Sequence, residues 1–387
     1  MHNYKRFSFF MPGETWIGFS AVEELGNSLL KKQATRGLIV TDEFMAASKA
    51  TEKVVAVLKK SGIETVIYKG VMPDPTMGQV TEATFEFIKN KCDALISIGG
   101  GSPHDCAKAV KYLLIKGNVC EKSKVIHAAV NTTAGTGSEL TKFAIITDEK
   151  NQTKMPIVDE IIIPDIAVDD TTFMMDMPQS LTAATGIDAM THAIEAYVSL
   201  ERNYVTSCTA IEGIKLVDQY LEMAYKDGQN VKARDGMAYA QYLAGMAFSN
   251  AGLGIVHAMA HQLGAMYHIP HGVSNAIILP YCIKYNASKG CELYTEIGKE
   301  LKLYQGNFSP KIAAEKLSAY IQKLNQAIGI PANLKEIGAC LDDFKQLAEK
   351  AMQDVSLVTN PVTTTEEEIV AIYTEAFDGK QGRKITG

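Results

Sequence analysis

The sequence lacks any pattern of paired cysteines. Its seven cysteines are scattered and odd in number, without a CxxC spacing, so neither a disulfide framework nor a cysteine-held zinc site is predicted. No apolar run reaches the roughly 18 residues that a membrane-spanning helix needs. No signal-peptide pattern follows Met1. We therefore expect a cytoplasmic protein without a membrane partner.

A strong excess of one charge is also missing. The chain has 38 lysines and arginines against 44 aspartates and glutamates, for a formal net charge of −6. Nucleic-acid-binding domains usually carry basic patches, so no nucleic-acid partner is expected, although a small charged metabolite could still bind. At 387 residues the chain is too long for one ordinary core, and two domains are expected.

The first part of the chain alternates short apolar strands with helical patterns. The seven main candidate strands lie at 36–41, 65–68, 94–98, 125–130, 143–147, 154–158 and 166–169. This alternation predicts a parallel sheet with helices on both faces. After Met177-Pro178 the strand signals fade. We therefore predict an α/β domain over 1–178 and an all-α domain over 179–387.

Only helical patterns remain beyond that boundary. Ten helices are predicted there, at 181–198, 204–224, 231–249, 252–266, 274–287, 291–302, 310–327, 333–338, 342–353 and 365–377.

Four of the eight histidines lie within 252–272. His257 and His261 are four residues apart in a stretch without proline, which places both rings on one face of a helix. Pro270 interrupts the helical pattern, so His271 is expected on a turn just beyond it.

A second pair, Asp188 and His192, is also four residues apart on an apolar helical stretch. A carboxylate and several imidazoles that face one another form a site for a first-row divalent ion. Nitrogen and oxygen donors suit Fe(II) or Zn(II) and do not choose between them. The spacing also leaves open which of the histidines at 257, 261, 268 and 271 is not a ligand.

The stretch from His257 to His261 also resembles the HExxH motif of zinc peptidases. That motif needs a glutamate after the first histidine as general base, and Ala258 stands there instead. A metal-dependent hydrolase is therefore only an alternative of a different class.

Two glycine-rich loops follow predicted strands. In the first, at 99–103, glycines allow a phosphate to approach backbone N–H groups at a helix start. His104 replaces the third glycine of GxGxxG, and the loop follows the third main strand, so ordinary Rossmann order is not expected. The second loop, at 131–139, is rich in hydroxyls and glycines. Each loop alone could be a plain turn, but the pair suggests a dinucleotide across the carboxyl edge of the sheet.

Asp42 directly follows the first strand of the alternating region. A carboxylate there can bind a ribose 2′-hydroxyl and repels a 2′-phosphate, which favours NAD(H) over NADP(H). The alternative interpretation is a turn aspartate at the end of a strand.

Four stretches together resemble the iron-containing (group III) alcohol dehydrogenase family, both in their residues and in their order along the chain. They lie at 99–105, 131–139, 183–196 and 252–272. The resemblance covers nearly the whole chain. It implies a Rossmann-like dinucleotide-binding domain followed by a helical metal-binding domain. The metal ligands that it implies are Asp188, His192, His257 and His271. It makes His261 a catalytic residue near the nicotinamide that is not a ligand.

The resemblance also implies the positions that line the cofactor and the substrate. The cofactor positions are Asp42, Asp74, Gly100, Gly101, Ser102, Asp105, Thr132, Thr133, Thr136 and Lys154. The substrate positions are Phe143, Phe248 and Leu253. Many relatives have Pro-Asn-Pro where this chain has Asp74 between two prolines, and this extra carboxylate could strengthen discrimination against NADP(H).

The activity implied is hydride transfer between NAD(H) and small primary alcohols, diols or aldehydes, with Fe(2+) or, as an alternative, Zn(2+) polarising the substrate oxygen. A homo-oligomer, either a dimer or a ring of dimers, is expected. Besides the hydrolase, two alternatives remain from the sequence: a zinc-dependent polyol dehydrogenase of glycerol type with the same fold, and a nucleotide-binding protein without catalysis.

Overall fold

The computed structural model describes residues 6–121, 125–150 and 153–379. The chain packs into two compact units, Met1–Asp176 and Met177–Gly387. The sequence places the domain boundary after Pro178, two residues further on. Each unit is described by itself.

The first unit is built on one six-stranded sheet in which every pair of neighbouring strands is parallel. Its strands are β1 (Glu14–Gly18), β2 (Arg36–Val40), β3 (Glu64–Tyr68), β4 (Ala94–Gly99), β5 (Ile126–Asn131) and β8 (Ile166–Asp170). Every residue of β4, β5 and β8 is buried. These strands are covered on both faces, which explains why their sequences are mostly apolar instead of alternating between apolar and polar residues.

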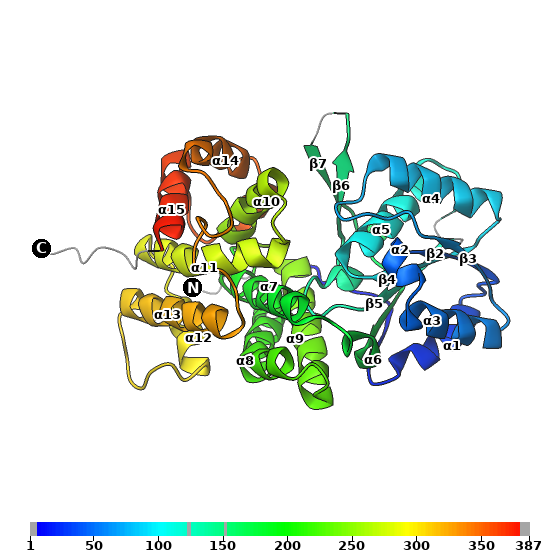
Figure 1. Cartoon of the computed structure of the whole chain (residues 1–387), viewed down its shortest axis with the longest axis horizontal. Coiled ribbons are helices and arrows are strands. Elements are labelled where there is room, and N and C mark those ends of the chain that lie inside the picture. The colour runs from blue at the N-terminus through cyan, green and yellow to red at the C-terminus, as the bar shows by residue number, and fades with distance from the viewer. Residues whose placement is uncertain (1–5, 122–124, 151–152, 380–387) are drawn as a thin grey trace, which may run out of the picture. The chain divides into compact units, whose positions relative to one another are not determined.

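Helices cover both faces of this sheet (Figure 1). They are η1 (Ala21–Glu24), α1 (Leu25–Lys31), α2 (Glu43–Ala46), α3 (Lys49–Lys60), α4 (Met77–Lys89), α5 (Gly101–Lys116) and α6 (Thr171–Met174). Alternate residues of a strand enter different cores: Ile96 packs with α1 and α3, whereas Leu95 packs with α4 and α5. Burying each such side chain stabilises the fold by roughly 1.5–3 kcal/mol.

The strand order, β1-β8-β5-β4-β2-β3, places the cofactor loops. The chain runs outward from β2 to β3 and then returns to the other side of β2 to form β4. The order therefore reverses between β2 and β4. Ligands of doubly wound sheets bind at the carboxyl ends of the strands beside such a reversal. Asp42 follows β2 and the first glycine loop follows β4, so both lie at this point.

A separate antiparallel hairpin, β6 (Phe143–Asp148) and β7 (Thr153–Val158), accounts for two of the predicted strands. It does not join the main sheet. Thr147 donates its N–H to the carbonyl of Pro75 at 2.8 Å, so the hairpin is tied to the loop before α4. Two short 3-10 turns, η3 (Ser138–Leu140) and η4 (Glu160–Ile162), flank the hairpin along the chain.

The second unit is helical in the residues described, as the sequence predicts. Its longer helices are α7 (Gln179–Val198), α8 (Tyr204–Lys226), α9 (Val231–Ala251), α10 (Ile255–Tyr267), α11 (His271–Ser288) and α13 (Pro310–Ala327). The shorter ones are α12 (Tyr294–Glu300), η5 (Leu341–Asp343), α14 (Phe344–Ala351), η6 (Val355–Thr359) and α15 (Glu366–Asp378). Residues 333–338 form turns, so the helix predicted there is wrong.

The prediction for His271 is also wrong. Pro270 is the N-cap of α11, and His271 is the first residue of that helix rather than part of a turn. Proline ends one helix and fits the start of the next, so the same residue gives both signals.

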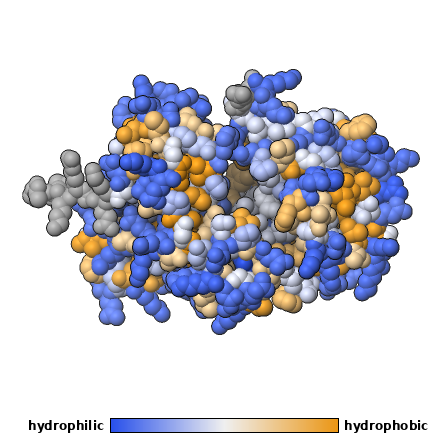
Figure 2. Space-filling model, in the orientation of Figure 1, coloured by the Kyte–Doolittle hydropathy of each residue, from blue (hydrophilic) through white to orange (hydrophobic). Residues whose placement is uncertain are grey.

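Polar side chains cover most of the visible surface, and exposed apolar ones form small groups between them (Figure 2). Within the described ranges, no single helix is long and apolar enough to cross a membrane. Only the pair α9 and α10, bent by 104°, meets that test of length and composition together.

Candidate functional site

Three helices of the second unit carry the four predicted metal ligands. Asp188 and His192 lie on α7, His257 on α10 and His271 at the start of α11. A close approach between α11 and α7 brings the last of these to the others. A Cβ on Gly272 would lie 1.9 Å from the carbonyl oxygen of Ala184, so only glycine fits there.

The donor atoms of the four residues converge, since one from each lies within 4.8 Å of all the others. The Oδ1 atom of Asp188 lies 3.9 Å, 3.7 Å and 3.5 Å from the Nε2 atoms of His192, His257 and His271 respectively. Four donors around one tetrahedral ion lie about 3.3–3.6 Å apart, given ordinary metal–ligand bond lengths. Three of the side chains are almost fully buried, whereas that of His271 is 39% exposed.

The charge on Asp188 suits a cation. Burial alone would raise the pKa of this carboxyl, but the imidazoles of His192, His271 and His257 together hold the pKa below its usual range. The carboxylate is thus the ionised form, which metal binding requires.

The amide of Asn275 lies among the same donors. Its Nδ2 donates to Asp188 Oδ1 at 2.7 Å and lies 3.1 Å from the Nε2 atoms of both His257 and His271. An amide NH₂ has two protons, which cannot satisfy three acceptors at once. Its Oδ1 is buried without a hydrogen-bond partner in the residues described. Nitrogen and oxygen donors thus crowd around one amide that cannot serve them all, and such a donor set fits a divalent cation.

Glu195, which the sequence reasoning missed, supports the ring of His257. Its Oε2 atom lies 2.5 Å from His257 Nδ1, and its Oε1 accepts the backbone N–H of Val256 at 2.7 Å. A carboxylate at Nδ1 fixes the proton there and leaves Nε2 free to bind a metal. Burial lowers the pKa of His257, but Glu195 and Asp188 outweigh burial and raise it to about 9. One signal was available: Glu195 lies seven residues after Asp188, on the same face of α7.

His261 lies one turn after His257 on α10 and is not one of the four converging residues. Its ring stacks on that of His271, with 5.2 Å between centroids. Its Nδ1 lies 2.8 Å from Asp354 Oδ2. His268, the fourth histidine of this stretch, ends α10 in a left-handed conformation with φ of 56° and is also outside the cluster.

The predicted substrate residues fall in both units. Phe248 stacks on His192 with 4.2 Å between ring centroids, so it forms an apolar wall of the metal cluster. The carbonyl of Leu253 accepts a hydrogen bond from Thr359 at 2.6 Å. Phe143 begins β6 in the first unit.

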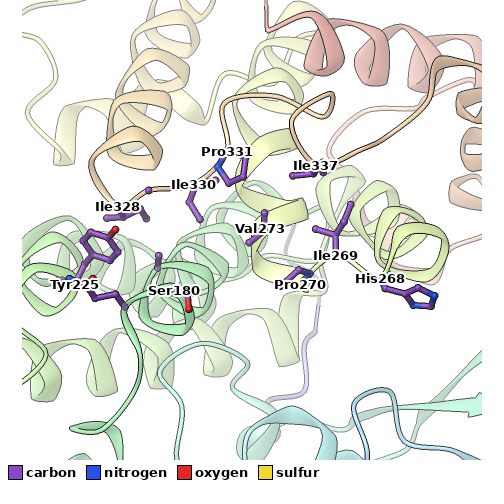
Figure 3. A pocket seen from close by; sticks show the side chains of 13 residues that line it. Ser180, Tyr225, His268, Ile269, Pro270, Val273, Ile328, Ile330, Pro331 and Ile337 are labelled. Carbon is purple, nitrogen blue, oxygen red and sulfur yellow. Dashed lines mark hydrogen bonds between the residues drawn. The ribbon is translucent and has the colours of Figure 1, made fainter.

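A hollow of about 720 Å³ in the second unit has mainly apolar walls (Figure 3). Ile269, Pro270 and Val273 line it near the start of α11, opposite Tyr225 and Ile330. None of the four converging residues and none of the predicted substrate residues lines this hollow. It is therefore not the predicted substrate pocket.

In the first unit, the structure brings the two glycine loops into contact. A Cβ on Gly100 would lie 3.1 Å from Thr133, and one on Gly101 would lie 3.4 Å from Thr136. The N–H of Thr132 also donates to the carbonyl of Gly99 at 3.0 Å. The two loops thus pack closely, most tightly at Gly100.

The start of α5 can receive an anion. Gly100 is its N-cap and provides no side-chain hydrogen bond, and Ser102 lies in the first turn. The first N–H groups of a helix have no partner within that helix. An anion at this end is therefore favoured by both hydrogen bonding and the helix dipole.

Several predicted cofactor side chains bond to other protein groups. Asp105 accepts hydrogen bonds from Ser138 Oγ at 2.7 Å and from the N–H of Ile145 at 3.0 Å. Lys108, which the sequence reasoning missed, is fully buried and donates to Ser138, Thr141 and the carbonyl of Phe143 at 2.7–2.9 Å. Burial lowers the pKa of Lys108 to about 8. These bonds join α5 to the second loop and to the hairpin.

The three remaining cofactor positions also have partners. Asp42 caps α2, since its Oδ1 accepts the N–H of Met45 at 2.7 Å. Asp74 and Lys154 form an ion pair at 2.6 Å. Asp74 has a left-handed φ of 56°, a conformation that asparagine and aspartate tolerate better than most residues.

The chain matches known proteins along nearly its whole length. The family described as "Iron-containing alcohol dehydrogenase" matches residues 12–171, and "Fe-containing alcohol dehydrogenase family, C-terminal" matches residues 182–377. Alcohol dehydrogenase 4 of Saccharomyces cerevisiae is 42% identical over 379 residues, which cover 96% of this chain and 98% of that protein. The NAD-dependent methanol dehydrogenase of Bacillus methanolicus is 39% identical over 379 residues, with coverage of 96% and 100%. The solved structure of an alcohol dehydrogenase from Oenococcus oeni superposes with a TM-score of 0.93 at 39% identity, with coverage of 96% and 100%.

Proposed function

Since the chain belongs to the iron-containing alcohol dehydrogenase family, we propose that it interconverts small primary alcohols or diols and their aldehydes, with NAD(H) as cofactor and Fe(2+) at the metal site. The ligands that we propose for the ion are Asp188, His192, His257 and His271. The convergence of their four donor atoms is the observation that carries the proposal.

The paired glycine loops argue against the hydrolase alternative. A hydrolase could use the same four donors to activate water, but it has no need of a dinucleotide site. The first loop lies at the strand-order reversal where dinucleotides bind in doubly wound sheets, and the second loop, after β5, lies against it. We place the cofactor along Gly100, Gly101, Ser102, Thr132, Thr133 and Thr136.

The protein's own residues would hold and orient the reactants. When bound, the ion would polarise the alcohol or aldehyde oxygen, and the nicotinamide would take up or supply the hydride. Phe248, stacked on His192, would give the substrate chain an apolar wall. His261 would carry the proton, because its Nδ1 is held by Asp354 and its other nitrogen stays available. Leu253 and Phe143 are the further substrate positions that we propose.

We propose NAD(H) over NADP(H) because of the charge at Asp42. One of its oxygens caps α2, and the carboxylate keeps a negative charge where a 2′-phosphate would bring another. The negative charge of Asp74 has less influence on the cofactor, because Lys154 pairs with it. We assign Asp74, Lys154 and Asp105 to the shaping of the cofactor site.

Three nitrogens and one oxygen suit Zn(2+) as well as Fe(2+). A zinc-dependent polyol dehydrogenase is therefore the second candidate function. We also propose that the protein is cytoplasmic and forms a homo-oligomer, a dimer or a ring of dimers, which light scattering of the purified protein tests.

The test is made without oxygen. The protein is loaded with Fe(2+), and NADH absorbance is followed with a panel of small aldehydes, then repeated with NADPH, with Zn(2+) and with His257→Ala. We expect iron-dependent NADH oxidation that the variant loses. Turnover only with zinc and polyols would favour the second candidate. Hydrolysis without any cofactor binding would contradict both.

A further inference from the structure

The segment from Asp354 to Asn360 is hydrogen-bonded to α10, the helix that carries His257 and His261. Asn360 Oδ1 accepts the N–H of Ile255, the first residue of α10, at 3.1 Å. Thr359 Oγ1 donates to the carbonyl of Leu253, just before that helix, at 2.6 Å. The segment thus holds the start of α10 by two hydrogen bonds, neither of which involves a histidine.

Asp354 is the member of this segment that reaches a histidine. Its Oδ1 accepts the N–H of Ser356 at 2.9 Å and so caps η6. Its Oδ2 lies 2.8 Å from His261 Nδ1 and 3.3 Å from Gln262 Nε2. The carboxylate is only 12% exposed, whereas the side chain of His261 is 25% exposed. One oxygen therefore fixes the carboxylate to the backbone, and the other faces the ring.

We propose that Asp354 is a positioning residue that acts through His261. A carboxylate accepts hydrogen bonds only, so it keeps a proton on Nδ1 and the lone pair on Nε2 in the neutral ring. It also fixes the ring angle on α10, where the ring stacks on His271. The inference rests on the proposed role of His261 and adds the group that sets its tautomer.

The contact between Asp354 and His261 can be distinguished by experiment from a carboxylate that only anchors the helix. Asp343, in the neighbouring η5, accepts the hydroxyl hydrogen of Tyr267 at 2.6 Å and anchors the end of the same helix. Both carboxylates attach a C-terminal turn to α10, but only that of Asp354 meets a histidine. Asp343→Asn is therefore the matched control.

The experiment is a double-mutant cycle on the metal-loaded protein. Asp354→Asn keeps a side chain that caps η6 well but loses the charge that holds the ring proton. We expect turnover to fall about 10–100-fold, the usual loss for a group that orients an active-site histidine. In the His261→Ala background the same change should alter turnover less than twofold, because its target is gone. Asp343→Asn should leave turnover within twofold in both backgrounds.

A second readout does not depend on turnover. In the Zn(2+)-loaded protein labelled with ¹⁵N-histidine, the His261 ring, identified by its absence in His261→Ala, should be the Nδ1–H tautomer. Asp354→Asn should shift it toward Nε2–H. Equal losses of turnover in both backgrounds, or an unchanged tautomer, would overturn the inference. A wild-type protein without dehydrogenase activity would contradict the proposed function instead, and the tautomer would still decide the role of Asp354.

Discussion

The two candidate sites are built in opposite ways. At the metal cluster, side chains from three helices converge on one point, and the single amide among them has too few protons for the donor atoms that it contacts. At the glycine loops, polar side chains are engaged by the protein itself: Asn131 donates to the carbonyl of Thr133 and to Asp169, and accepts the N–H of Thr133. The groups that the loops present to a ligand are backbone N–H groups at the start of α5, which no side chain caps.

This difference explains which mutations should damage each site. A site made of converging side chains fails when one donor is removed. A site made of backbone fails when a Cβ is added or a torsion angle is strained. The changes below test that contrast in each unit.

Removing a ligand should have the largest effect. His257→Ala deletes one of the four donors, and the metal's stabilisation of several kcal/mol is lost with it, so turnover should fall about 10³-fold or more. Metal content by atomic absorption and NADH-linked turnover are measured on the same sample. His268→Asn is the control, because it suits the left-handed φ of 56° and lies outside the cluster. A His257→Ala protein that kept its metal would exclude this residue as a ligand.

The support behind a ligand should matter next. Glu195→Gln replaces one acceptor oxygen by an NH₂ group, which cannot accept the proton on His257 Nδ1. Metal affinity should fall about 10–100-fold, measured by competition with a chelator. The control is Glu296→Gln. Glu296 lies on α12 and accepts a hydrogen bond from Tyr197, which is on the same helix, α7, as Glu195. An unchanged affinity in Glu195→Gln would mean that the ring is held by packing alone.

Whether a feature of these sites could be predicted from the sequence depends on how far apart its interacting residues lie along the chain. The pair Asp188 and His192 lies within one helix, so its spacing alone predicts a shared face. The bond between Glu195 and His257 spans 62 positions, and no local pattern predicts it. The same holds for Lys108, whose partners at 138, 141 and 143 lie on another loop and strand.

Errors at element ends have a local cause. The sequence pattern predicts a helix break at Pro270, which is correct for α10, but Pro270 is also the N-cap of α11. At 333–338 the pattern lacks the length that a stable isolated helix needs. The α/β and all-α halves were predicted correctly, because each depends on a periodicity repeated over many elements rather than on one boundary.

A backbone change should have a smaller effect, limited to the cofactor. Gly99 has φ of 144°, and a Cβ there would lie 2.7 Å from Pro103 Cγ. Gly99→Ala should therefore strain the first loop by about 1–3 kcal/mol and raise KM for NADH about tenfold, with metal content unchanged. Gly62→Ala is the matched control for backbone strain, since Gly62 also has a positive φ, of 75°, but a Cβ there would meet nothing within 4 Å. The contrast between the sites would fail if Gly99→Ala lost metal instead.

The smallest effect expected is on cofactor choice. Asp42→Asn keeps a side chain that can cap α2, since asparagine and aspartate cap equally well, but removes the charge next to the 2′ position. Turnover with NADPH relative to NADH should rise about fivefold, the effect of roughly 1 kcal/mol from one screened charge. Asp42→Ala should give a similar ratio and also lower the thermal stability, because the cap is lost at a cost of about 1 kcal/mol. If only Asp42→Ala changed the ratio, the cap and not the charge would set the specificity, and the cofactor site would depend on backbone position at Asp42 as well.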